Sequence, residues 1–126
     1  MYKGKVWRFV YGWRDRITWA FKYIGKHKTG MIQGDGYIGS GTKLHEIYNA
    51  LGEEEFHKRY EDIILEFCFD KDSLNEAEIK WIDQEKTLYT YGGWNLSLGG
   101  DGGWDYVNQN KLHPQYNNKP LWSEIQ

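Results

Sequence analysis

Apolar residues recur at helical spacing in the second half of the chain. Leu74, Ala77 and Trp81 fall on one face of a helix, because residues three or four positions apart are neighbours there. Glu78 shares that face, between Leu74 and Trp81. An ionised carboxylate that faces a core is costly unless a cation pairs with it. The pattern therefore predicts either a carboxylate held for a metal or cationic side chain, or a solvated or lysine-paired residue at the rim of the apolar face.

The same segment carries a start signal for its helix. Ser73 is followed three residues later by Glu76, which is the capping-box pattern of a helix N-terminus. We expect a turn at residues 70–72 and a helix from Ser73 to about Thr87.

Segments rich in aromatic and β-branched residues predict three strands. Residues 5–11 and 18–24 are typical of an antiparallel hairpin, with its turn at residues 14–16. Residues 60–69 are typical of a third strand, although residues 53–59 could prolong a helix into it.

Glycine marks most of the remaining boundaries. A short helix is expected over residues 42–51, with Gly52 at its end. Residues 29–41 and 91–104 are rich in glycine and predict loops. Residues 105–126 are polar and predict a tail that packs on the domain or extends from it.

The order strand, strand, helix, strand, helix predicts one small α+β domain over residues 1–104, a three-stranded antiparallel sheet flanked by helices. The chain of 126 residues is long enough for a single modest core. No apolar run reaches the length of a membrane span. The single cysteine, Cys68, has no partner for a disulfide within the chain, which fits a reducing cytosol.

Charge is distributed unevenly along the chain. The formal net charge is -2, yet the first 30 residues hold eight Lys or Arg residues against one acid, Asp15. Such asymmetry predicts a basic face directed at an anionic partner, most commonly phosphate. Ordinary surface lysines that happen to cluster are the alternative. The candidate phosphate contacts are Arg8, Lys22, Lys26, Lys28 and, from the next predicted helix, Lys43.

Four motifs, in order along residues 5–104, resemble those of the GIY-YIG nuclease superfamily. Tyr23-Ile24-Gly25 matches the second half of that name, and Phe9-Val10-Tyr11 keeps the tyrosine of the first half at the usual spacing. The segment around Glu78 resembles the family's late helix, and Trp94-Asn95-Leu96 resembles its closing element.

The resemblance implies a metal-dependent site for phosphodiester hydrolysis. In such a site Tyr11 helps to activate the attacking water, Tyr23 contacts the phosphate or the water network, and Glu78 binds Mg²⁺ or Mn²⁺. Gly25 and Asn95 support the site structurally. Without the resemblance, packing within the hairpin is the simpler role for two strand tyrosines.

One residue that the family usually carries is missing. Its members have an arginine on the first helix, whereas residues 42–51 contain Lys43 and His45 but no arginine. His27 and Lys26 are the nearest substitutes, and we expect His27 to be catalytic. A histidine there suits phosphate binding or proton transfer, because its reference pKa is about 6.5. A surface histidine in a lysine-rich turn is the alternative.

We therefore predict a divalent-metal-dependent endonuclease that hydrolyses DNA phosphodiester bonds, of phage or mobile-element type, acting in the cytoplasm of a host cell. DNA is the expected partner, with no membrane association and no small-molecule cofactor; the oligomeric state stays open. The main alternative is a catalytically inactive nucleic-acid-binding module with the same fold, favoured by the missing arginine. A structural or protein-interaction domain is the third interpretation, favoured by the net acidic charge and the aromatic content.

Overall fold

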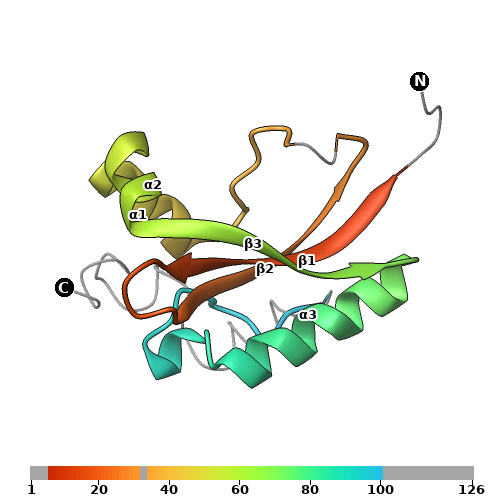
Figure 1. Ribbon diagram of the computed structural model, residues 1–126. Coiled ribbons are helices and arrows are strands. Elements are labelled where there is room, and N and C mark those ends of the chain that lie inside the picture. The colour runs from red at the N-terminus through yellow and green to blue at the C-terminus, as the bar shows by residue number, and fades with distance from the viewer. Residues whose placement is uncertain (1–5, 32–33, 101–126) are drawn as a thin grey trace.

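The computed structural model describes residues 6–31 and 34–100 (Figure 1). Three antiparallel strands, β1 (Trp7–Asp15), β2 (Phe21–Thr29) and β3 (Tyr60–Cys68), form one sheet in the order β2-β1-β3. β1 is therefore the central strand, and β2 and β3 are the two edges. The predicted α+β class with a three-stranded antiparallel sheet is confirmed.

Helices cover both faces of this sheet. α1 (Thr42–Leu51) and α2 (Glu53–Arg59) lie together at one end of one face, and α3 (Lys71–Glu85) runs along the other face (Figure 1). A single 3-10 turn, η1 (Tyr89–Tyr91), follows α3. Among the described residues no helix is both long and apolar enough to cross a membrane.

Alternation along β1 divides the core into two clusters, because successive side chains of a strand point to opposite faces. The cluster on the side of α1 and α2 consists of Phe9, Tyr11, Trp13, Tyr23, Leu44, Ile47, Phe56, Tyr60 and Trp94. The cluster beneath α3 consists of Val10, Ile24, Leu74, Ala77, Ile82 and Leu88. The two tyrosines that the sequence singled out therefore belong to the first cluster.

The hairpin is longer than the sequence predicted, and its turn lies elsewhere. β1 continues to Asp15, so the turn predicted at residues 14–16 is wrong and the second strand begins only at Phe21. The Asp15 side chain sets the turn, because its Oδ1 accepts hydrogen bonds from the backbone N–H groups of Ile17 (2.8 Å) and Thr18 (3.0 Å). β2 consequently extends through the lysine-rich segment to Thr29.

The helix that carries Glu78 begins earlier than predicted. Asp70, not Ser73, is the N-cap residue of α3: its Oδ1 accepts a hydrogen bond from the Ser73 N–H at 2.8 Å. The Ser73 hydroxyl in turn accepts one from the Asp70 N–H at 3.3 Å. The capping box is therefore formed by Asp70 and Ser73 rather than by Ser73 and Glu76.

The remaining helix boundaries agree with the prediction. α1 spans Thr42–Leu51, and Gly52, with a φ of 85°, ends it. Residues 53–59 are helical, as the alternative allowed, but they form a separate helix, α2, and the third strand begins at Tyr60 as predicted. The predicted tail, residues 105–126, lies outside the described residues, as do residues 1–5 and 101–104 of the predicted domain.

Candidate active site

Tyr11 and Tyr23 come together because they lie on adjacent strands and point to the same face of the sheet. Their ring centroids are 6.3 Å apart, and each side chain is 6% exposed. Gly25 is the direct cross-strand partner of Tyr11. A Cβ at position 25 would lie 2.5 Å from the Tyr11 hydroxyl oxygen, so this position requires glycine. The predicted supporting role of Gly25 thus has a steric basis.

Burial controls the protonation state of both tyrosines. The pKa of Tyr11 is raised above its ordinary value, first by burial and then by the charges of Tyr23, Tyr37 and Glu78. The pKa of Tyr23 is raised by burial, Glu78 and Tyr37, against hydrogen bonds to Ser40 and Gly41 that lower it. Both side chains are therefore neutral hydroxyls at neutral pH. The charge of the Glu78 carboxylate thus acts on both hydroxyls.

Glu78 lies on the buried face of α3, as its spacing predicted. The side chain is 8% exposed, and its Oε1 accepts a hydrogen bond from the Gly100 N–H at 2.7 Å. One turn earlier on the same face, Asn75 accepts a hydrogen bond from the Lys26 ammonium. Glu78 therefore lies where α3, the edge strand β2 and the glycine loop at residues 99–100 meet.

Asn95 takes the place of a neighbouring strand along the β2 edge. Its side-chain Nδ2 donates to the Ile24 carbonyl, and its Oδ1 accepts from the Ile24 N–H, both at 2.8 Å. Ile24 separates Tyr23 from Gly25, so these two bonds fix the strand at the point where it carries the candidate site. This arrangement agrees with the structural role expected for Asn95.

Asn95→Ala is predicted to lower the free energy of unfolding by about 2–4 kcal/mol, because it leaves the two Ile24 backbone groups without partners in a buried setting. Chemical denaturation measures this loss. Asn49→Ala, at an exposed position of α1, is the matched control and should stay within about 0.5 kcal/mol of the wild type. Equal losses of unfolding free energy in the two variants would contradict the structural role of Asn95.

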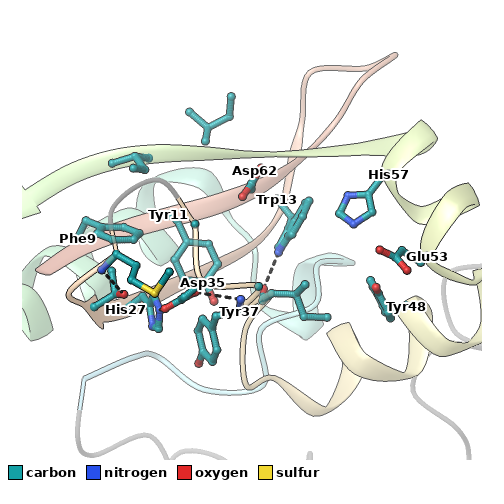
Figure 2. Close-up of a pocket in the computed structure, with 17 residues that line it drawn as sticks. Phe9, Tyr11, Trp13, His27, Asp35, Tyr37, Tyr48, Glu53, His57 and Asp62 are labelled. Atoms are coloured by element: carbon teal, nitrogen blue, oxygen red, sulfur yellow. Dashed lines mark hydrogen bonds and ion pairs between the residues drawn. The ribbon is translucent and has the colours of Figure 1, made fainter. Parts of the chain in front are cut away.

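His27 belongs to a unit with two residues that sequence reasoning missed, Asp35 and Tyr37. The His27 Nε2 and the Asp35 Oδ2 are 2.7 Å apart, and the imidazole stacks on the Tyr37 ring with centroids 4.0 Å apart (Figure 2). The Asp35 Oδ1 also accepts from the Tyr37 N–H at 3.0 Å. The sequence signal that would have found this unit is Asp35-Gly36, a typical turn with a side-chain acceptor.

The hydrogen bond from His27 helps to hold the Asp35 carboxylate in its ionised form. Further hydrogen bonds come from Thr29 and Tyr37. Together these hydrogen bonds lower the pKa of Asp35 to about 2. An ionised carboxylate only accepts hydrogen bonds, so the hydrogen of the imidazole is assigned to Nε2 and leaves Nδ1 as the second functional nitrogen.

Lys43 and His45 of α1 both contact neighbouring segments. The His45 Nε2 lies 2.5 Å from the Gly39 carbonyl oxygen, and a Cβ on Gly39 would be 2.7 Å from the Tyr11 hydroxyl. His45 therefore helps to hold the loop against Tyr11. Lys43 is fully buried, with its Nζ 4.1 Å from the centroid of the Tyr89 ring. Lys43 offers no solvent-facing surface for the phosphate contact that the sequence suggested.

The other predicted phosphate contacts occupy different places around β1 and β2. Arg8 and Lys28 are direct cross-strand partners, so two positive charges lie side by side, an arrangement that an anionic ligand would relieve. Lys28 is exposed and Lys22 is half-buried. On β2, Lys26 and Lys28 alternate with His27, so they point to the face of the sheet opposite His27.

The chain is similar to several proteins of Enterobacteria phage T4. It is 46% identical over 86 residues, 68% of its length, to segB, which is named as a candidate endonuclease and of which 36% is covered. It is 35% identical over 81 residues, 64% of its length, to endonuclease segA, of which 34% is covered. The chain thus matches only about a third of these relatives. No model of a known protein family and no solved structure matches it.

These comparisons make the chain a relative of phage endonucleases.

Proposed function

We propose that this chain is a divalent-metal-dependent DNA endonuclease of the GIY-YIG type, from a phage or a mobile element. The observation that carries the proposal is a pair of adjacent buried tyrosines, Tyr11 and Tyr23, whose pKa values the charge of the buried Glu78 carboxylate helps to raise. The similarity to T4 endonucleases supports the nuclease activity.

Glu78 fits the requirements of a Mg²⁺ or Mn²⁺ ligand. Mg²⁺ in phosphate enzymes is usually held by one or two carboxylates together with substrate phosphates, and it keeps several waters. A single buried carboxylate beside the two hydroxyls meets this requirement, and Gly100 N–H orients it. Within residues 6–31 and 34–100 there is no group of three His, Cys, Asp or Glu side chains that could hold a metal, and the site we propose has Glu78 as its single protein ligand. When bound, the ion would neutralise charge that develops on the phosphoryl oxygens.

The side chains around Glu78 supply the remaining parts of a hydrolytic site. As neutral hydroxyls, Tyr11 and Tyr23 can donate hydrogen bonds to phosphoryl oxygens and accept one from the attacking water. The hydrogen bond between the two hydroxyls provides a path along which a proton can leave that water. The His27 Nδ1 is available to exchange a proton with the substrate, because Asp35 fixes the orientation of the ring.

A nuclease assay tests this proposal. Covalently closed circular DNA should be nicked or linearised with Mg²⁺ or Mn²⁺ and should stay intact with EDTA. The second candidate function is a catalytically inactive DNA-binding module, favoured by the absence of arginine on α1 and by the burial of Lys43 on that helix. Salt-dependent binding without cleavage under any of these conditions would select the inactive module.

His27→Ala is predicted to lower the cleavage rate by about 100-fold or more, on the scale of general acid–base groups. Asp35→Asn should also lower the cleavage rate, because the neutral amide replaces the anionic acceptor that orients the His27 imidazole. Since the Asp35 pKa is depressed, its charge persists above about pH 4 and is lost only as the pH falls toward 2, so titration of Asp35 itself should not change the wild-type cleavage rate between pH 6 and 8.

The control for His27 is His45→Ala, which should cost less, because His45 contacts the Gly39 carbonyl rather than the site itself. A larger loss for His45→Ala than for His27→Ala would move the catalytic role to α1. Initial cleavage rates at saturating DNA separate the two outcomes.

Lys28→Glu is predicted to weaken DNA binding for all sequences and to reduce the slope of log K against log salt by about one. Lys28 is exposed and lies beside Arg8, so a phosphate can reach both charges. Lys80→Glu on α3 is the control, since Lys80 already pairs with Glu66 at 2.8 Å. Fluorescence anisotropy over a salt series measures both slopes, and indistinguishable slopes would argue against a basic DNA-binding face.

A further inference from the structure

A groove of about 320 Å³ lies next to the candidate site, between the sheet and the loop that precedes α1 (Figure 2). Its floor consists of two cross-strand pairs of β1 and β3, Tyr11 with Ile64 and Trp13 with Asp62. Ile64 is apolar and yet 43% exposed. The floor therefore offers the aliphatic surface of Ile64 to solvent, whereas Tyr11 and Trp13 beside it are buried.

The two ends of the groove carry different groups. Tyr37, His27 and Asp35 lie at one end, and Glu53 and His57 of α2 lie at the other, with Trp13 between them (Figure 2). Tyr37 is 41% exposed although its ring stacks on His27. An exposed flat ring thus borders the groove at the end where His27 lies.

The lining is acidic. It includes the carboxylates of Asp35, Glu53 and Asp62, and no Lys or Arg side chain belongs to the lining among the described residues. Asp35 is engaged with His27, but within the described part of the chain neither Asp62 nor Glu53 makes a side-chain hydrogen bond or ion pair that would occupy its oxygens. Such a groove repels phosphate and favours a group that combines a flat apolar body with N–H donors at its edge.

Tyr11 connects this groove to the candidate active site. Its ring lines the groove, whereas its hydroxyl belongs to the cluster with Tyr23 and Glu78. A nucleotide whose phosphate lies at that cluster can therefore place its own base, or that of its neighbour, in the groove. The volume lies near the lower end of the range for ligand pockets, about 300–1,000 Å³, which suits a single ring system rather than a larger ligand.

We propose that this groove binds an unstacked nucleobase that carries an exocyclic amino group, next to the phosphate that is cleaved. The inference rests on the proposed function and names the form of substrate that the site takes: DNA that is single-stranded, or from which a base has been flipped, at the cut. The base lies against the exposed Tyr37 ring and the exposed Ile64 side chain, and the Asp62 and Glu53 carboxylates accept hydrogen bonds from its amino group.

Binding of single-stranded oligonucleotides to the full chain in EDTA tests the inference without any cleavage. The probes are oligo-dC and oligo-dU of about 12 nucleotides, because cytosine and uracil have nearly the same size, and cytosine carries an exocyclic amino group where uracil carries a carbonyl oxygen. Fluorescence anisotropy should show oligo-dC binding about ten-fold more tightly than oligo-dU. In the double variant Asp62→Asn/Glu53→Gln this ratio should fall to within two-fold.

Glu54→Gln is the matched control, because Glu54 neighbours Glu53 on α2 but does not line the groove, and it should keep the ten-fold ratio. Equal affinity of the wild type for the two probes would overturn the inference, as would a ratio that the double variant leaves unchanged. Tighter binding of an arginine-rich peptide than of either oligonucleotide, lost in the double variant, would also overturn it and assign the groove to a cationic protein partner. A ten-fold ratio of oligo-dC to oligo-dU affinity in a protein that shows no metal-dependent cleavage would support the base-binding groove and contradict the proposed catalysis.

Discussion

Glu78→Gln is expected to lower the rate of metal-dependent DNA cleavage by about 10³-fold and to leave the fold intact. Glutamine keeps the volume of the side chain, and its Oε1 can still accept the hydrogen bond from Gly100. It removes the negative charge that would hold the cation. Initial cleavage rates over a Mg²⁺ series measure the loss, and thermal unfolding checks the fold.

The control for this variant is Glu76→Gln, two residues away on the exposed side of α3, which should cleave at the wild-type rate. A Glu78→Gln protein that cleaves DNA at nearly the wild-type rate would show that Glu78 is not the metal ligand. A much lower melting temperature would instead assign Glu78 to an ion pair that stabilises the fold.

Tyr11→Phe is expected to lower the cleavage rate by about 10²–10⁴-fold with little change in DNA affinity, because the hydroxyl acts on the transition state rather than in binding. The phenyl ring preserves the packing against Tyr23 and the lining of the groove. Tyr23→Phe should act in the same direction. Single-turnover rates and equilibrium binding separate the two effects.

Tyr91→Phe is the control for the tyrosine variants, since Tyr91 is exposed in η1, away from both core clusters. Wild-type rates for both Tyr11→Phe and Tyr23→Phe would leave packing as the only role of the two tyrosines.

Unfolding at alkaline pH provides an independent measurement of the burial of Tyr11. Because burial raises the pKa of Tyr11, the stability it contributes is present below about pH 10 and is lost as the pH rises further, so Tyr11→Phe should resist alkali better.

Local patterns in the sequence were sufficient to place Glu78 on a buried helix face and to bound α1. Both depend on spacing of a few residues, which the backbone geometry of a helix translates directly into position. The start of α3 was wrong because Asp70 and Ser73 are both good capping residues, and the sequence does not show which one leaves the helix first. The hairpin turn was wrong because the Asp15 side chain sets it.

Contacts between segments that are distant in the sequence could not be predicted from its local patterns. The burial of Lys43 depends on Tyr89, which a loop after α3 brings over α1. The role of Asp35 depends on how its loop folds back over β2 to reach His27. The groove exists only because β3 pairs with β1 beneath that loop. Neither helical nor strand periodicity carries information about such contacts, which tertiary packing alone decides.

A double-mutant cycle of Glu78→Gln and Tyr11→Phe tests most directly whether these residues form one catalytic site. Residues that act as a unit have strongly non-additive effects on rate. We expect the double variant to cleave circular DNA no more slowly than the slower of the two single variants, with Mg²⁺ and at matched protein concentration. Losses that multiply in the double variant would show that Tyr11 and Glu78 act independently and would contradict a shared site.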